Sequence, residues 1–324
     1  MKEMGFLISL KENEKRRALL PSDINYIKNK HMLFFERGYG EVLGISDNEY
    51  IKKGVNVVTR EKIYEKDIIC CLKTPEKFEY KYFSEGQTLF GWIHAVQGVE
   101  ITNFLVEKKM TAYAWEDMFE KGRHIFYKNN EIAGEASVWH ALLHKGSMMK
   151  NLNVAVLGQG NTARGAIRLL EKLGHNVTIY NRNTLSVFKE KINKYDIVVN
   201  AVLWDVFLED RIIYKDDLKK MRKNSLIIDI SCNDRMEIET AYPTPLSNPM
   251  YLEGDVWHYT ADHTPSLFWM DASESISNKV KLYIDPLVEN TQNDVLEAAE
   301  ILRCGKIMDK RIIKFQERFI KSLV

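Results

Sequence analysis

The chain has 324 residues, of which 45% are hydrophobic and 28% charged, and its formal net charge is +1. This composition is typical of a globular protein with a large core and argues against disorder, nucleic-acid binding and a membrane span, while the length favours two domains. Four cysteines without a CxxC pair predict neither a disulfide framework nor a metal site, and the absence of an export signal indicates a cytoplasmic protein.

The first part of the chain alternates short β-type runs with helical patterns. Strands are predicted over 4–10, 32–36, 67–72, 88–93 and 111–115, and helices over 22–29, 47–53 and 98–109. Such alternation predicts an α/β fold with a mostly parallel sheet and helices on both faces. A long helix over 131–145 then leads into a second unit of the same kind.

The second part gives clearer signals, because its strands are continuously apolar, as in a parallel sheet covered on both faces. Strands are predicted over 153–157, 176–180, 195–201 and 225–230, a helix over 162–173, and a proline-rich loop over 242–249. Asp271 and Glu274 have the spacing of a capping box, so a helix is predicted to begin there. From 290 onward the pattern is helical, and these helices are expected to fold back on the first domain.

A glycine-rich turn follows the first strand of the second part, in the order Gly158-x-Gly160-x-x-Ala163. Gly158 permits a tight turn, Gly160 lets the backbone approach a pyrophosphate, and Ala163 allows close packing of helix on strand. The helix N-terminus, at Asn161 and Thr162, would face the phosphates. The motif predicts a Rossmann dinucleotide-binding domain; the alternative is a turn in which the glycines are purely structural.

These patterns together predict two doubly wound α/β domains with mostly parallel sheets and a cleft between them. The substrate and catalytic domain is expected to comprise 1–133 and 272–324, and the Rossmann domain 134–271. In open sheets of this kind, ligands bind at the carboxyl ends of the strands. We therefore look for functional side chains directly after the predicted strands.

The end of the strand after the glycine turn favours NADP over NAD. An NAD site normally has Asp or Glu there, and the stretch 180–184 has no acid. Arg182 could pair with the 2′-phosphate of NADP, while Asn181 and Thr184 could donate hydrogen bonds. In the alternative interpretation, Arg182 is simply exposed and Thr184 is a helix N-cap.

Three side chains in the first part are candidates for substrate binding and proton transfer. Arg16 follows the first strand, Lys73 follows the strand over 67–72, and His94 follows the strand over 88–93. Lys73 and His94 could transfer protons near neutral pH, and Arg16 could bind a carboxylate through two hydrogen bonds. Taken singly, the ordinary interpretation is favoured for each: a surface lysine, a structural histidine and a solvated arginine in a loop.

With these motifs, nearly the whole chain resembles the family of alanine dehydrogenase and lysine-forming saccharopine dehydrogenase. The resemblance rests on Arg16 with 18–21, on 72–76, 90–94, 132–134 and 229–231, and on the glycine turn; 261–267 and 271–274 are closer to the saccharopine branch. The matches imply keto-acid binding by Arg16 and Lys73, acid–base catalysis by His94, cleft positions for Glu116 and Arg123, and cofactor contacts for Ser231, Asp262 and His263.

The short length and the Asn181-Arg182 pair resemble family members that join pyruvate to the side-chain amine of ornithine, and less well of lysine, with NADPH. The resemblance thus implies a reductive condensation of small molecules by a homo-oligomer. Alanine dehydrogenases have Asp-Gln-Gly-Gly where this chain has 233–236, which argues against simple ammonia chemistry. The alternatives are an alanine or saccharopine dehydrogenase and, from another class, a non-catalytic NADPH-binding sensor, which would leave Arg16, Lys73 and His94 unexplained.

Overall fold

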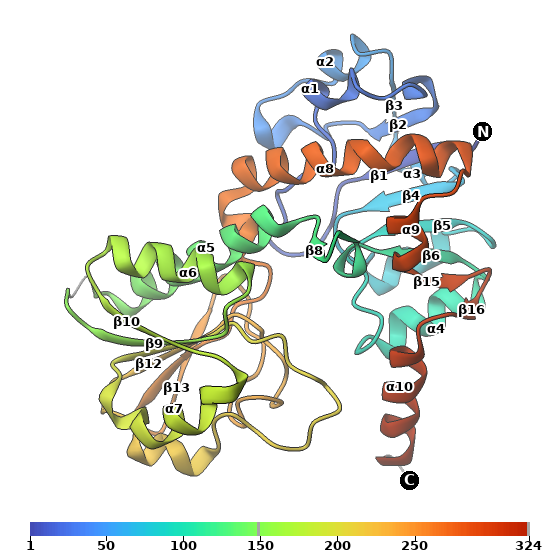
Figure 1. The fold of residues 1–324 in the computed structure, drawn as a ribbon. Coiled ribbons are helices and arrows are strands. Elements are labelled where there is room, and N and C mark those ends of the chain that lie inside the picture. Colours follow the sequence, from blue (N-terminus) through green and yellow to red (C-terminus); the bar gives the residue numbers. More distant parts are fainter. Residues whose placement is uncertain (148–149, 323–324) are drawn as a thin grey trace. The chain divides into compact units, whose positions relative to one another are not determined.

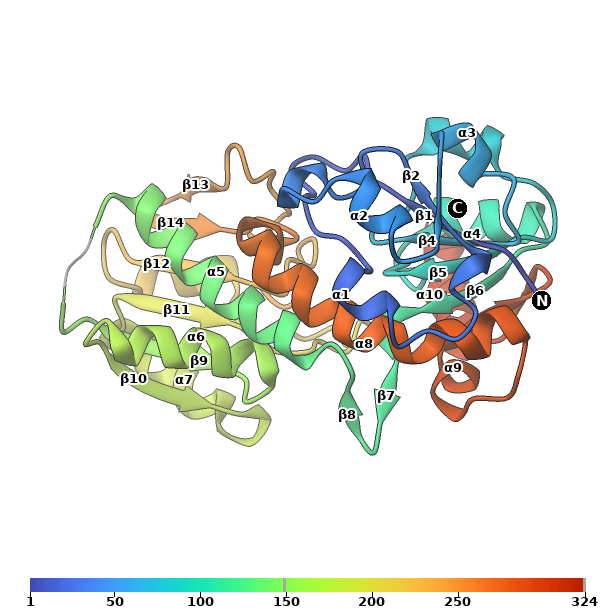
Figure 2. The same cartoon turned by 90° about the horizontal axis from the view of Figure 1, so that it is seen from above.

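The computed structural model describes residues 1–147 and 150–322, and the chain forms two compact units (Figures 1 and 2). The first unit comprises Met1–Phe126 and Trp269–Val324, and the second is Tyr127–Phe268. Each unit is built on a mostly parallel sheet, which confirms the predicted α/β fold class. Within the described ranges, every helix is too short or too polar to cross a bilayer.

The first unit contains an eight-stranded sheet in the order β16-β15-β6-β5-β4-β1-β2-β3. Its strands are β1 (Met4–Leu7), β2 (Leu33–Glu36), β3 (Asn56–Val58), β4 (Ile68–Cys71), β5 (Thr88–Gly91), β6 (Thr111–Ala114), β15 (Glu300–Arg303) and β16 (Lys306–Ile307). Strands β1 to β6 are parallel, whereas β15 and β16 pair antiparallel at the edge. The carboxyl ends of β1, β4, β5 and β6 therefore share one edge of the sheet.

Helices cover both faces of this sheet. They are α1 (Pro21–Ile24), α2 (Asp47–Ile51), α3 (Arg60–Ile63), α4 (Val99–Glu107), α8 (Trp269–Glu289), α9 (Asp294–Ala299) and α10 (Lys310–Ser322), with 3₁₀ turns at Lys30–Met32, Glu41–Leu43, Lys77–Tyr82 and Trp115–Asp117. Helix α8 packs Ile276, Val280 and Ile284 into a core with Phe6 and Phe35. Their spacing gives α8 the apolar stripe of an amphipathic helix. Helix α4 contributes to a separate core on the other face.

The second unit contains a six-stranded sheet in the order β10-β9-β11-β12-β14-β13. Its strands are β9 (Asn153–Leu157), β10 (Asn176–Tyr180), β11 (Ile197–Asn200), β12 (Leu226–Asp229), β13 (Met250–Glu253) and β14 (Val256–Tyr259); its helices are α5 (Tyr127–Lys145), α6 (Asn161–Lys172) and α7 (Leu185–Lys191), with 3₁₀ turns at Arg182–Thr184, Ile192–Lys194, Lys215–Lys220 and Thr264–Phe268. All pairs are parallel except β13 with β14. Its two apolar cores lie on opposite faces of the sheet, because alternate strand residues point to opposite sides.

Helices α5 and α6 lie side by side with their backbones in close contact (Figure 2). A Cβ atom on Gly134 would lie 2.0 Å from the carbonyl oxygen of Thr162, and one on Gly165 would lie 1.9 Å from that of Glu131. No side chain fits at those distances, so the crossing requires glycine on both helices. The contact fixes the start of α6, which follows the glycine turn.

Three expectations from the sequence were wrong. The helix predicted to start at Asp271 begins two residues earlier, at Trp269. The 3₁₀ turn Thr264–Phe268 leads directly into it, so Asp271 lies in its first turn. The helix predicted over 22–29 is only the four residues of α1. The C-terminal region is not wholly helical: Leu302 pairs with Ala112 of β6, so β15 extends the sheet between α9 and α10.

Candidate active site

Arg16 and Glu14 form a buried ion pair in the loop after β1. Arg16 is 3% exposed and Glu14 6% exposed. The Nε atom of Arg16 donates to Glu14 Oε1 at 2.8 Å, and its Nη2 donates to Oε2 at 2.5 Å. The guanidinium also lies over the ring of Trp92, 5.1 Å from its centroid. A guanidinium held by two hydrogen bonds and a ring face has a fixed orientation before any ligand arrives.

The rest of this loop is pinned by neighbouring elements of the same unit. The backbone N–H of Arg17 donates to Ser273 Oγ on α8 at 2.8 Å, and the N–H of Ala18 donates to the hydroxyl of Tyr39 at 2.8 Å. These bonds satisfy backbone groups that would otherwise be buried without partners. The position of Arg16 is thus set by the fold around it and by its own side chain.

Lys73 contributes a second positive charge near Glu14. It is 9% exposed and follows the carboxyl end of β4, which pairs directly with β1. Burial alone would raise the pKa of the Glu14 carboxyl, but the charges of Arg16 and Lys73 and the hydrogen bonds from Arg16 bring it below its usual value. Glu14 is therefore ionised, with two cations beside it. The sequence analysis identified both cations but not Glu14, the acid that orients Arg16.

His94 follows the carboxyl end of β5, and its backbone is in the left-handed region with a φ of 52°. Non-glycine residues adopt this conformation rarely, and it persists where the surroundings enforce it. Here the carboxylate of Glu116 accepts hydrogen bonds from the backbone N–H groups of Ile93 at 3.2 Å and of His94 at 2.5 Å. Glu116 therefore holds the turn that presents His94.

Arg123 belongs to a small antiparallel hairpin formed by β7 (Phe119–Glu120) and β8 (Arg123–His124). Its side chain is exposed, unlike that of Arg16. The structure thus brings Arg16, Lys73, His94 and Glu116 to one edge of the first sheet, and carries Arg123 on a separate hairpin of the same unit.

The predicted glycine turn lies between β9 and α6 in the second unit. Gly158 has a φ of 115°, and a Cβ atom there would lie 2.6 Å from the carbonyl oxygen of Ala201. Gly160 precedes the helix, and a Cβ atom there would meet no atom within 4 Å. Ala163 is fully buried, and Asn161 and Thr162 form the first turn of the helix. An open space at a helix N-terminus fits the pyrophosphate of a dinucleotide.

The side chains after β10 are arranged around a short 3₁₀ turn. The N–H of Asn181 donates to Thr184 Oγ1 at 2.9 Å, and Asn181 Oδ1 accepts from the N–H of Asn183 at 3.0 Å. The Thr184 side chain accepts no N–H from α7, so it does not act as a side-chain N-cap of that helix. Arg182 is exposed and donates to the carbonyl oxygen of Leu203 at 3.0 Å.

The remaining predicted cofactor residues lie after β12 and β14 of the same sheet. Ser231 Oγ donates to the carbonyl oxygen of Val202 at 2.7 Å. His263 has a φ of 45°, its N–H donates to Asp262 Oδ1 at 2.6 Å, and its Nδ1 lies 3.5 Å from Asp262 Oδ2. Because both strands end at the edge that carries the glycine turn, these residues belong to the same side of the sheet.

Two acids that the sequence analysis did not identify as a pair are buried together at this edge. Asp229 and Glu237 are both fully buried, and the amide of Asn200 donates to Asp229 Oδ1 at 2.9 Å and to Glu237 Oε1 at 3.2 Å. The other oxygen of Asp229 has no partner among the described residues. Burial and the neighbouring acid raise the pKa of Asp229, and burial raises the pKa of Glu237.

The buried acid pair predicts a pH-dependent stability. The folded state retains a proton that the unfolded chain releases above about pH 4, so stability should fall as pH rises from there through the raised pKa values. Asp229→Asn should flatten this dependence, by up to about 1.4 kcal/mol per pH unit. Urea unfolding at mildly acidic and mildly alkaline pH checks the effect, with the exposed Asp234→Asn as control. An unchanged slope in the first variant would contradict it.

Comparisons with known proteins agree with the family predicted from the motifs. The family model of the alanine dehydrogenase/PNT N-terminal domain matches residues 9–133, and that of the C-terminal domain matches residues 183–314. A Clostridium botulinum protein named N(5)-(carboxyethyl)ornithine synthase is 32% identical over 315 residues, covering 89% of this chain and 98% of its own. A Lactococcus lactis protein of the same name is 33% identical over 281 residues, covering 82% and 90%.

Solved structures show the same fold at lower identity. An L-alanine dehydrogenase has a TM-score of 0.82 and 21% identity, over 97% of this chain and 99% of its own. A transhydrogenase from Sinorhizobium meliloti has a TM-score of 0.78 and 18% identity, over 95% and 99%. With matching family models over both parts and relatives above 30% identity along most of its length, the chain belongs to the alanine dehydrogenase/PNT family of oxidoreductases.

Proposed function

We propose that this chain catalyses the NADPH-dependent reductive condensation of pyruvate with the side-chain amine of ornithine and, less well, of lysine. The observation that carries the proposal is the buried group of Glu14, Arg16 and Lys73, in which two cations flank one carboxylate at the carboxyl edge of a parallel sheet. Such a group suits a small keto acid with a carboxylate and a carbonyl oxygen. The similarity to two proteins named N(5)-(carboxyethyl)ornithine synthase supports the choice of product.

In the proposed reaction, Arg16 binds the carboxylate of pyruvate and Lys73 donates a hydrogen bond to its keto oxygen. The ammonium of Lys73 polarises the carbonyl, so that the neutral side-chain amine of ornithine can attack its carbon. Glu14 keeps the guanidinium oriented throughout. Because Arg16 is fixed by Glu14 and Trp92, little reorganisation of its guanidinium is required when the substrate binds.

His94 is the proposed acid–base group. Condensation requires removal of a proton from the attacking nitrogen and delivery of one to the hydroxyl that leaves as water, and imidazole side chains do both near neutral pH. Glu116 holds the backbone of His94, and its remaining lone pairs are proposed to accept the α-ammonium of ornithine, with Arg123 for the α-carboxylate. When bound, the nicotinamide supplies the hydride that reduces the imine carbon.

The test measures NADPH oxidation with pyruvate and, separately, ornithine, lysine, putrescine and ammonia, with products identified by mass spectrometry. We expect a secondary amine carrying both carboxylates, formed fastest with ornithine, because its distant charged groups help to orient the reacting amine. Alanine as the main product would instead support an alanine dehydrogenase. Faster reaction of 2-oxoglutarate with lysine would support a saccharopine dehydrogenase, and NADPH binding without any turnover would support a sensor.

A preference for NADP over NAD is part of the proposal, supported by Arg182 at the end of β10 and by the absence of an acid there. In Arg182→Ala, the affinity for NADPH should fall roughly tenfold or more, since a charge-assisted contact is worth about 1.5–3 kcal/mol. The affinity for NADH should barely change. Fluorescence titration with both nucleotides measures this, with the exposed Arg222→Ala as control. Equal binding of NADH and NADPH by the unmodified protein would refute the preference.

A further inference from the structure

We propose that the second unit has a binding site for a divalent transition-metal ion of the class of Zn²⁺ and Ni²⁺, formed by His140 and His144. Both residues lie on α5, four residues apart, so their side chains project from the same face of the helix. Their Nε2 atoms are 3.1 Å apart, and their ring centroids are 4.4 Å apart. Neither histidine takes part in the proposed reaction, so the two proposals can fail separately.

The separation of the two ring nitrogens suits two ligands of one metal ion. Zn²⁺ binds imidazole nitrogen at about 2.0–2.1 Å, and two such bonds that meet at roughly 90–109° place their nitrogens roughly 2.8–3.4 Å apart. The observed 3.1 Å lies within this range. The two atoms share one hydrogen bond, which the ion would replace after a small rotation of the exposed His144 ring.

Tyr259 orients His140 through the other nitrogen of its ring. His140 Nδ1 lies 3.0 Å from the hydroxyl of Tyr259, the fully buried last residue of β14. When Nδ1 carries the proton and donates it to this hydroxyl, the Nε2 lone pair is left for a metal ion. Burial, and then the charge of His144, lower the pKa of His140 to about 4. At neutral pH the imidazole is therefore in the neutral form that binds metals.

The composition of the pair limits the class of ion. Within residues 1–147 and 150–322, no group of three or more His, Cys, Asp or Glu side chains is placed to hold a metal ion. Water would therefore fill the other coordination positions. Imidazole nitrogen suits Zn²⁺, Ni²⁺ and Cu²⁺, whereas Mg²⁺ and Ca²⁺ prefer oxygen ligands.

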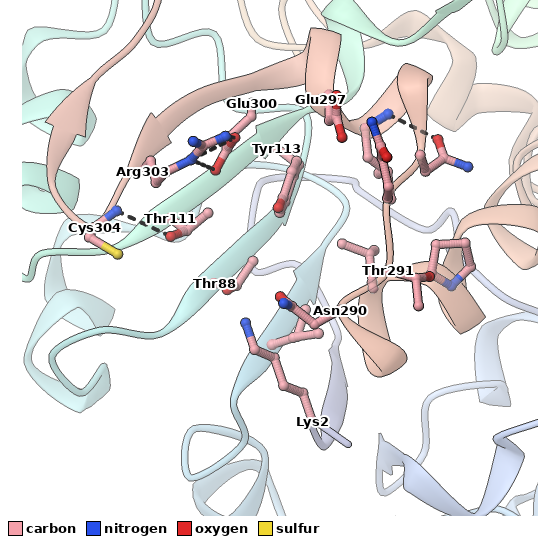
Figure 3. Close-up of a pocket in the computed structure, with 16 residues that line it drawn as sticks. Lys2, Thr88, Thr111, Tyr113, Asn290, Thr291, Glu297, Glu300, Arg303 and Cys304 are labelled. Atoms are coloured by element: carbon pink, nitrogen blue, oxygen red, sulfur yellow. Dashed lines mark hydrogen bonds and ion pairs between the residues drawn. The ribbon is translucent and has the colours of Figure 1, made fainter.

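The exposed thiol of Cys304 is a competing ligand, because thiolates bind Zn²⁺ as well. Cys304 lines a cavity of about 480 Å³ in the first unit, together with Glu300 and Arg303 (Figure 3). The Nε of Arg303 donates to the two carboxylate oxygens of Glu300 at 2.9 and 3.0 Å, so this acid is already neutralised. We therefore expect the histidine pair to bind the ion more tightly than this thiol.

Calorimetric titration of the untagged full chain with ZnCl₂ and NiCl₂ tests the site, with MgCl₂ as the control ion. We expect one Zn²⁺ per chain, both in the unmodified protein and in Cys304→Ser. His144→Ala removes a ligand from an exposed position and should weaken binding at least tenfold, whereas the exposed His31→Ala should not. Absence of binding by both ions, equal affinity in His144→Ala, or loss of binding in Cys304→Ser would overturn the proposal.

Tyr259→Phe tests the orientation of His140 without removing a ligand. Its affinity for Zn²⁺ should fall about tenfold or more, the usual effect of losing the hydrogen-bond partner of a ligating histidine. Electron paramagnetic resonance with Cu²⁺ gives a second readout, in which we expect coupling to two nitrogens in the unmodified protein and to one in His144→Ala. Circular dichroism confirms that each variant is folded. A Cu²⁺ spectrum without nitrogen coupling in the unmodified protein would also overturn the proposal.

Discussion

His94→Ala should lower kcat for pyruvate and ornithine by about a hundredfold or more, the usual contribution of a general acid–base group. The imidazole is presented after β5 by a strained turn that Glu116 holds, so the loss of the side chain removes the proton-transfer group and leaves the turn in place. The affinity for NADPH, which we assign to the second unit, should not change. Stopped-flow or steady-state NADPH oxidation measures the first quantity and fluorescence titration the second.

The exposed His31 supplies a matched control, because His31→Ala removes an imidazole of the same unit far along the chain from the candidate site. Its kcat should equal that of the unmodified protein. A near-normal kcat in His94→Ala would show that His94 has no catalytic role and is an ordinary surface histidine. A parallel loss of NADPH affinity would instead indicate general structural damage.

Gly165→Ala should destabilise the protein by about 3 kcal/mol or more, at the upper end of overpacking effects. The added methyl would lie 1.9 Å from the carbonyl oxygen of Glu131, so α5 and α6 must separate. Alanine is otherwise favoured over glycine in a helix by about 1 kcal/mol, so any large loss must come from this contact. Urea unfolding measures the change. Since α6 begins at the glycine turn, dinucleotide affinity should fall as well.

Gly160→Ala separates binding from stability. A Cβ atom at this position meets nothing within 4 Å, and the φ of −72° suits any residue. Stability should therefore stay near that of the unmodified protein, while NADPH affinity falls because the methyl would take space proposed for the pyrophosphate. If Gly165→Ala were as stable as Gly160→Ala, the tight helix crossing would be wrong.

The second unit was the easier part to predict, for a physical reason. The strand predicted over 153–157 has those bounds in the structure, because its residues after Asn153 are buried inside the sheet, and a strand covered on both faces is apolar throughout. The strand predicted over 176–180 also has its predicted bounds, although it is the edge strand and is mostly exposed. The apolar residues Val295, Ala298, Ala299 and Leu302, by contrast, fit a helical period, and nothing local shows that Leu302 pairs with Ala112. Pairing between residues so distant in sequence depends on tertiary structure.

Some residues of the candidate site could be predicted from local sequence, and others could not. Arg16, Lys73 and His94 could be selected because each follows a predicted strand, and their proposed roles stay predictions until the variants are measured. Glu14 could not be selected, since it lies in a run of charged residues whose burial only the fold reveals. Glu237 comes from a loop and meets Asp229 through Asn200, a juxtaposition without a local signal.

The second unit, Tyr127–Phe268, is inserted in the sequence of the first unit. The two parts of the first unit are therefore synthesised at different times. A ribosome completes β6 long before it completes β15, the strand that covers one edge of β6. At about 5–20 residues per second, the delay is many seconds, during which the second unit can fold and β6 remains an open edge. Open edges pair with other chains. We therefore expect the nascent protein to be a chaperone client until its last strand emerges.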